Sequence, residues 1–325
     1  MKVLNRLILL VFLVFFIFLG YKVVEKFLSL KSIPDDGYVL LVKKNQTLKS
    51  ISFKLSNEKI FNNKFTSFLL FRTLIGNDGI NAGEYFINKN DNLLDLALKI
   101  KNKQYYYRKI VFIEGNLLST YIEQIKNAEG IVFDDFKKID EGYFMPGTYL
   151  YLYGEKTSNL INKINKEMLN FVSTEFNKIN NKESFYLKNI HEVITLASIV
   201  EKETGIPSER PLIAGVFYNR LQKNMRLQSD PTAVYEITKG SSDLNRNLTY
   251  KDLQVVGKYN TYRISGLPVG PIASPSKSAI LAVLNPKKTD YIFFVANGLG
   301  GHTFAVDFKT HKENVKRYRE LSKLK

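Results

Sequence analysis

The stretch that decides the fold is residues 189–205, NIHEVITLASIVEKETG. Asn189, with Glu192 three positions later, has the pattern of a capping box and predicts the start of a helix. Gly205, followed by Pro207, predicts its end. Because the residues between them are apolar on nearly every side, we expect this helix to be buried in the core of a domain.

Glu201 is the first candidate for chemistry, because it lies near the end of this apolar helix. Removing a carboxyl group from water raises its pKa and lets it act as an acid near neutral pH. A second acid, Glu203, lies about 200° further round the helix, so the two do not pair on one face. A structural ion pair from Glu201 to a loop arginine such as Arg220 or Arg263 is the alternative, and the helix alone favours it.

Three later segments carry polar side chains suited to a ligand rich in hydroxyl and amide groups. They are residues 219–232, the Gly- and Pro-punctuated residues 259–272, and residues 300–304. Ordinary turn and helix-start chemistry is the alternative explanation for these segments. The candidate substrate-binding residues are Asn219, Arg220, Gln228, Asp230, Thr232, Asn260, Tyr262 and His302.

The composition excludes several kinds of site. The chain has no cysteine, which rules out disulfides, thiol nucleophiles and thiolate metal sites. Its three histidines are scattered, so we expect no metal and no cofactor. The net charge of +16 is compatible with nucleic acid, an acidic membrane surface, an acidic polymer or a merely solvated surface. No recognisable nucleic-acid-binding motif is present, which argues against the first.

An apolar run, Leu7–Leu19, follows Lys2 and Arg6 near the N-terminus. With its flanks it approaches the ~17–20 residues of a membrane span. A cleaved signal peptide is the alternative, but no small-x-small cleavage site follows. We therefore expect an uncleaved transmembrane helix at 7–24, whose orientation the nearly balanced flanking charges do not set.

Residues 38–126 contain a short strand, a polar turn and an amphipathic helix in succession, three times over. This pattern predicts a small α+β module that binds or positions a ligand and has no catalytic residues of its own. A mixed α/β domain closed by a hairpin and a basic helix is expected after it. The predicted organisation is 1–6 tail, 7–24 transmembrane helix, 25–37 connector, 38–126 module, 127–188 linking helical region and 189–325 catalytic domain.

Six segments together resemble the endolytic murein transglycosylase family, the MltG or YceG-like proteins. They are LASIVEKE (196–203), IAGVFYNRL (213–221), RLQSDPT (226–232), YNTY (259–262), GLPVGPI (266–272) and GGHTF (300–304). Their order and spacing match the family, and the resemblance extends along the whole chain. Two departures, Val269 where the family usually has Pro and Asn224 where it usually has Gly, affect only local loop geometry.

The resemblance implies a single-span inner-membrane protein with a cytoplasmic N-terminus, a LysM-like module and an extracytoplasmic catalytic domain. It implies a lyase that cuts the MurNAc–GlcNAc β-1,4 bond within nascent glycan strands, leaving 1,6-anhydro-MurNAc ends and setting chain length. By the same resemblance Glu201 is the catalytic acid and then the base, because the sugar's own C6 hydroxyl replaces a second carboxylate. Peptidoglycan strands and penicillin-binding cell-wall synthases are the implied partners.

Two other functions stay open. The chain could be a non-catalytic peptidoglycan-binding scaffold for cell-wall synthases. It could also be a hydrolytic muramidase that uses Asp230 as a second carboxylate. The mass of the product distinguishes the enzymes, because a lyase fragment is one water lighter than a hydrolase fragment.

Overall fold

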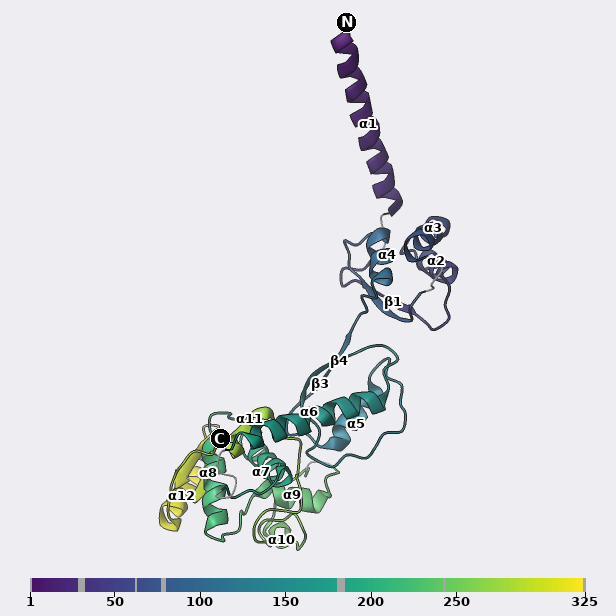
Figure 1. Cartoon of the computed structure of the whole chain (residues 1–325). Coiled ribbons are helices and arrows are strands. Elements are labelled where there is room, and N and C mark those ends of the chain that lie inside the picture. Colours follow the sequence, from purple (N-terminus) through teal and green to yellow (C-terminus); the bar gives the residue numbers. More distant parts are fainter. Residues whose placement is uncertain are drawn as a thin grey trace. The chain divides into compact units, whose positions relative to one another are not determined.

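The structure, a computed structural model, describes residues 2–28, 33–61, 63–76, 80–179, 185–241 and 244–323 (Figure 1). The chain divides into two compact units, residues 1–108 with 150–154, and residues 109–149 with 155–325. The first unit holds two of the three predicted strand–turn–helix pairs, and the second unit holds the third. The predicted domain boundaries stay predictions, and the predicted connector and linking region lie partly outside the described residues.

Helix α1 (Lys2–Leu28) contains the apolar run near the N-terminus. The prediction of a transmembrane helix at 7–24 is wrong, since no helix in the described part of the chain is both long and apolar enough to cross a membrane. The physical reason is length. The uninterrupted run, Leu7–Leu19, rises only about 20 Å, whereas a bilayer core is about 30 Å thick. Beyond it the helix is charged, and Lys22 pairs with Glu25 at 2.8 Å.

The first unit packs three helices against a two-stranded sheet. Leu40 and Tyr85 face each other in the antiparallel register, and both are fully buried. Capping explains where the helices begin: Thr47 accepts the N–H of Ser50, and Asn92 forms a capping box. The sequence reasoning did not predict the helix that Asn63 caps. The elements are β1 (Tyr38–Val42), α2 (Leu48–Asn57), α3 (Lys64–Ile75), β2 (Gly83–Ile87) and α4 (Leu93–Lys101).

The second unit is built around helix α7 (Ile190–Glu203), as the sequence predicted. The Asn189 side chain accepts the N–H of Glu192 at 2.9 Å, and every residue from 193 to 200 is fully buried. Helices α6, α8, α9 and α11 pack against α7. Their bounds are α6 (Thr157–Asn177), α8 (Arg210–Gln222), α9 (Asp230–Thr238) and α11 (Lys277–Leu284).

Most of the remaining elements are short, and β3 and β4 each have residues in both units. The predicted hairpin is confirmed, with Phe294 opposite Phe304 in the antiparallel pair of β5 and β6. The C-terminal helix packs on this hairpin. The elements are β3 (Arg108–Phe112), which pairs with β4 (Gly147–Tyr151), α5 (Leu118–Asn127), α10 (Tyr250–Leu253), β5 (Phe293–Ala296), β6 (His302–Ala305) and α12 (Phe308–Lys323). The structure is thus α+β, as predicted, without the transmembrane helix.

Gly215 allows helix α8 to approach the chain at Lys287 closely. A Cβ atom at this position would lie 2.3 Å from the carbonyl oxygen of Lys287. The backbone N–H of Lys287 donates to the carbonyl of Pro211 at 2.9 Å, so this segment is held against the helix.

We therefore expect Gly215→Ala to lower the free energy of unfolding by about 1–3 kcal/mol, because the added methyl meets backbone that cannot move freely. Gly205→Ala is the matched control, since a Cβ there meets nothing within 4 Å. Urea unfolding of the two variants measures the difference. Equal stabilities would contradict the close approach at Gly215.

Candidate active site

A cavity of about 560 Å³ lies in the second unit, beside the C-terminal end of α7 and the β5–β6 hairpin. Five of the eight predicted substrate-binding residues line it: Arg220, Gln228, Asp230, Tyr262 and His302. The other lining residues are Glu203, Leu227, Phe293, Phe294, Val295, Ala296, Phe308, His311, Val315 and Tyr318. The cavity therefore combines a small polar set with an aromatic and aliphatic wall, which is typical of ligand sites.

Glu203, the last residue of α7, is the carboxyl group with the most altered chemistry in this cavity. Its side chain accepts a hydrogen bond from the Ser229 hydroxyl. Burial raises the pKa of Glu203 to about 7, and the negative charge of Asp230 adds to this. The Ser229 hydrogen bond and the positive charge of Arg220 act in the opposite direction. A carboxyl group with this pKa can both donate and accept a proton near neutral pH.

Asp230 and Tyr262 form a pair on the same wall. The Tyr262 hydroxyl donates to Oδ1 of Asp230 at 2.5 Å. Asp230 is the first residue of α9, where the helix N-terminus stabilises a negative charge. Ser229 precedes it, so one short turn carries both the hydrogen-bond donor to Glu203 and the neighbouring carboxylate.

Arg220 holds the polar wall together from inside. It is 8% exposed, and its guanidinium donates to the carbonyls of Ile292 at 2.7 Å and Leu227 at 2.8 Å. It also donates to the side chain of Gln228 at 3.4 Å and lies 5.2 Å from the ring centroid of Phe293. These contacts join helix α8 to the residues before α9 and to the hairpin, so Arg220 positions the wall.

His302 is held at the cavity by Glu209. Its Nδ1 lies 2.8 Å from one carboxylate oxygen of Glu209, and its backbone N–H donates to the other at 2.9 Å. Burial alone would raise the pKa of Glu209, but hydrogen bonds from His302 and Thr204 outweigh it and lower the pKa. Since Nδ1 is engaged, Nε2 is the ring nitrogen left for a ligand.

Glu201 lies elsewhere. Its side chain is 4% exposed and pairs with Nη2 of Arg210 at 2.7 Å. The backbone N–H of Ser276 donates to its other oxygen at 2.9 Å, and the Ser276 hydroxyl donates to the same oxygen. These are the contacts of a structural ion pair, with Arg210 in place of the loop arginines considered from the sequence. They argue against the predicted catalytic role of Glu201.

The remaining three predicted residues do not line the cavity but form hydrogen bonds that hold nearby loops. The Asn219 amide donates to the carbonyls of Thr289 and Tyr291 at 2.7 and 2.9 Å. Thr232 is fully buried and bonds Thr261 at 2.8 Å. Asn260, also fully buried, donates to the carbonyl of Val255 at 2.7 Å. All three fix loops and do not line the cavity wall.

The residues that sequence reasoning missed are Glu203, Ser229, Glu209 and the aromatic pair of β5. The available signal was the helical angle between the two acids, which directs them to opposite sides of α7. Among the described residues, no group of three or more His, Asp or Glu side chains gathers in a way that could hold a metal ion.

The sequence model of the YceG-like family matches residues 40–317. The chain belongs to this family. The resemblance predicted from the sequence is thereby confirmed, and the match covers every residue of the cavity wall except Tyr318.

Known relatives agree with this assignment. An endolytic murein transglycosylase from Bacillus subtilis (strain 168) is 33% identical over 245 residues, which cover 73% of this chain and 65% of the relative. One from Streptococcus pneumoniae serotype 2 (strain D39) is 35% identical over 179 residues, 54% of this chain and 31% of that protein. The chain thus spans less than two thirds of either relative.

A solved structure shows the same fold. The crystal structure of a yceG-like protein from Listeria monocytogenes superposes with a TM-score of 0.55 at 26% sequence identity. The superposition covers 86% of this chain and 99% of the Listeria chain.

The raised pKa of Glu203 predicts a dependence of stability on pH. Its pKa in the folded protein is about 7, above the ordinary value of 4.5, so the folded state binds more protons between these values. The free energy of unfolding should therefore fall as the pH rises from about 4.5 to about 7, and stay lower above it.

Glu203→Gln removes this effect, so we expect the variant to gain stability relative to wild type between pH 5 and pH 8. The gain is at most about 3 kcal/mol. Urea unfolding at both pH values measures it, with the exposed Glu313→Gln as control. A wild-type minus variant difference that does not change with pH would contradict the raised pKa.

Proposed function

We propose that this chain is an endolytic peptidoglycan lytic transglycosylase with Glu203 as its single acid–base group. The observation that carries the proposal is a carboxyl group with a pKa of about 7 on the wall of a cavity whose other polar groups are already oriented. The names of the Bacillus and Streptococcus relatives support the same reaction. We expect no cofactor, because the chemistry needs only proton transfer.

The reaction begins with protonated Glu203. It donates its proton to the oxygen of the MurNAc–GlcNAc β-1,4 bond while positive charge develops at C1 of MurNAc. The carboxylate then accepts the proton of the C6 hydroxyl of the same sugar as that oxygen closes on C1. The product is a 1,6-anhydro end. Attack within one sugar ring avoids the entropic cost of bringing in a second reactant.

The neighbours of Glu203 suit this sequence of steps. Ser229 orients the carboxyl group by its hydrogen bond. Burial raises the pKa of Glu203, the charge of Asp230 adds to this, and Asp230 places negative charge near the developing positive charge. Phe293 and Phe294 provide apolar surface for a sugar face, and Nε2 of His302 offers a polar contact beside them.

A muramidase is the second candidate, because Glu203 and Asp230 line one cavity as a two-carboxylate hydrolase would require. The Tyr262 hydrogen bond to Asp230 argues against a free second base. A hydrolase would add water and give a reducing end, so fragment masses distinguish the two reactions.

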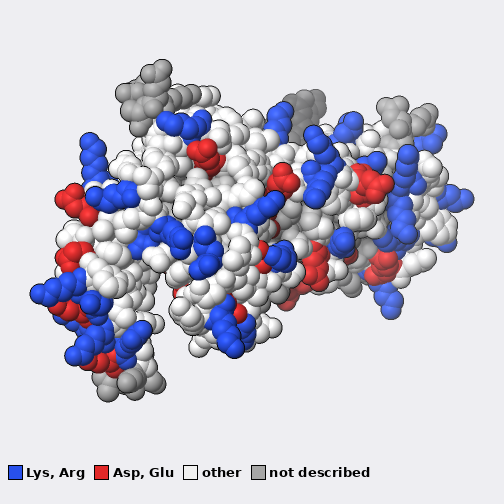
Figure 2. Space-filling view, turned by 90° about the horizontal axis from the view of Figure 1, so that it is seen from below, with Lys and Arg blue, Asp and Glu red and all other residues white. Residues whose placement is uncertain are grey.

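The same proposal extends to place and partners. We propose that the reaction takes place outside the cytoplasm on nascent strands, near the cell-wall synthases, and sets glycan length. The strand–turn–helix unit at 38–101 would serve as a LysM-like glycan holder. Nucleic acid is not a proposed partner: Figure 2 shows Lys and Arg dispersed among Asp and Glu on the face in view.

We expect Glu203→Gln to lower the release of anhydro-ended fragments from purified peptidoglycan by about 10²–10⁴-fold, because it removes the proton donor. Glu201→Gln is the matched control from the same helix. It weakens a buried ion pair, so it lowers stability but leaves the reaction of the folded fraction in place.

Mass spectrometry of the fragments is the measurement, with circular dichroism to establish the folded fraction of each variant. Near-normal release by Glu203→Gln would contradict Glu203 as the acid, and complete loss by a folded Glu201→Gln would favour Glu201 instead. If the wild-type fragments were heavier than anhydro-ended fragments by one water, the protein would be a muramidase and not a lyase.

A further inference from the structure

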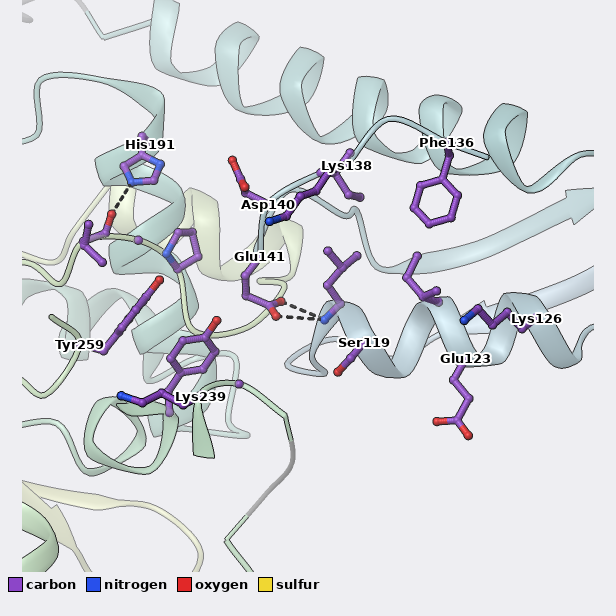
Figure 3. A pocket seen from close by; sticks show the side chains of 18 of the residues that line it. Ser119, Glu123, Lys126, Phe136, Lys138, Asp140, Glu141, His191, Lys239 and Tyr259 are labelled. Atoms are coloured by element: carbon purple, nitrogen blue, oxygen red, sulfur yellow. Dashed lines mark hydrogen bonds between the residues drawn. The ribbon is translucent and has the colours of Figure 1, made fainter. Parts of the chain in front are cut away.

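We propose that a second cavity, of about 1090 Å³ and in the same unit, binds the peptide that branches from the glycan strand. This inference rests on the proposed function. The cavity lies among helix α5, residues 136–141, the C-terminal end of α9 and the loop that ends at Pro271 (Figure 3). None of the residues proposed to carry the reaction lines it.

The second cavity carries charges of both signs. Three lysines and three acids line it: Lys126, Lys138, Lys239, Glu123, Asp140 and Glu141. Peptidoglycan peptides are similarly mixed, with carboxylates along the chain and an amino group on the diamino acid. A neutral sugar chain could not form ion pairs with these side chains. A peptide that carries both carboxylates and an amino group could pair with charges of both signs.

Two of these charges are available to a ligand. Within the described residues, neither Lys138 nor Asp140 makes an ion pair, and both are exposed. They lie two positions apart on the segment that ends at Glu141 (Figure 3). Lys138 would thus contact a peptide carboxylate and Asp140 a peptide amine. Lys239, by contrast, is paired with Glu236.

Glu141 gives this side of the cavity a fixed geometry. Both of its oxygens accept the N–H of Leu118, at 3.0 and 3.2 Å, so it caps helix α5 from a distant part of the chain. Figure 3 shows it directed at the first turn of α5. Burial raises the pKa of Glu141 to about 7 despite these hydrogen bonds and one from Gly142. Its role here is to hold residues 136–141 in place.

The opposite wall is aromatic and equally fixed. The ring centroids of Tyr235 and Tyr259 lie 4.6 Å apart. His191 holds the loop beside them, since its Nδ1 bonds the Tyr143 hydroxyl at 2.8 Å and its Nε2 bonds the carbonyl of Val269 at 2.9 Å. Such a wall offers apolar contact to the methyl groups of a peptide while the lysines meet its carboxylates.

The two cavities share their supporting elements, which is why one polymer can occupy both. Helix α9 has Asp230 on the first cavity and Tyr235 on the second. The following loop has Tyr262 on the first and Tyr259 on the second. At 1.5 Å per residue, the nine-residue helix α9 spans about 12 Å, so a glycan in the first cavity brings its peptide within reach of the second.

The test compares Lys138→Glu with Lys137→Glu, an equal charge change one residue away and outside the cavity lining. Each full-length variant is given glycan strands with peptides and the same strands stripped by an amidase. For Lys138→Glu we expect the ratio of the two kcat/KM values, peptide-bearing over stripped, to fall about tenfold, as expected for the loss of one charge-assisted contact. For Lys137→Glu the ratio should equal that of wild type.

Binding of the free stem tripeptide, measured by NMR titration of the whole chain, provides a readout that needs no activity. Wild type and Lys137→Glu should bind it, and Lys138→Glu should bind at least tenfold more weakly. An unchanged ratio for Lys138→Glu, or equal tripeptide binding by all three proteins, would overturn the peptide site. If wild type cleaves neither strand, the proposed reaction fails and the titration alone decides the site.

Discussion

The buried ion pair between Glu201 and Arg210 is the interaction on which the second unit depends. It ties helix α7 to the start of α8, and Ser276 ties the same carboxylate to the start of α11. Both charges are almost completely removed from water, so loss of either partner leaves an uncompensated charge in the core. The fully buried residues 193–200 and the helices packed around α7 fix its rotation together with this pair, and so set the direction in which its last residue points.

Glu203 acquires its chemistry from this constraint. Two residues after Glu201, it leaves α7 on the other side and meets Ser229 and Asp230 at the start of α9. Glu201 is paired with Arg210, whereas Glu203 is buried beside the negative charge of Asp230. Two neighbouring acids on one helix therefore have different environments. The proposed reaction needs an acid that is also a competent base, and the environment of Glu203 suits this requirement.

The sequence predicted the elements better than the directions of their side chains. Capping by Asn189 and the apolar composition identified α7 and its burial, because both signals are local. Which of two acids faces the cavity depends on how α8 and α11 pack, and helix periodicity alone does not contain that information. The residues of one motif also differ in what they contact. Tyr262 lines the cavity, whereas Asn260 holds its loop by a hydrogen bond to the carbonyl of Val255. The transmembrane prediction was wrong for a different reason: it relied on the apolar composition of Leu7–Leu19, and this run is too short to span a bilayer.

The most direct test of the central claim is the pH dependence of kcat/KM for release of anhydro-ended fragments by the wild-type chain. The proposed reaction consumes the protonated form of Glu203, whose pKa is about 7. We therefore predict that kcat/KM falls tenfold for each pH unit above about 7. A profile that is flat from pH 6 to pH 9, or that falls already near the ordinary carboxyl value of 4.5, would contradict Glu203 as the acid.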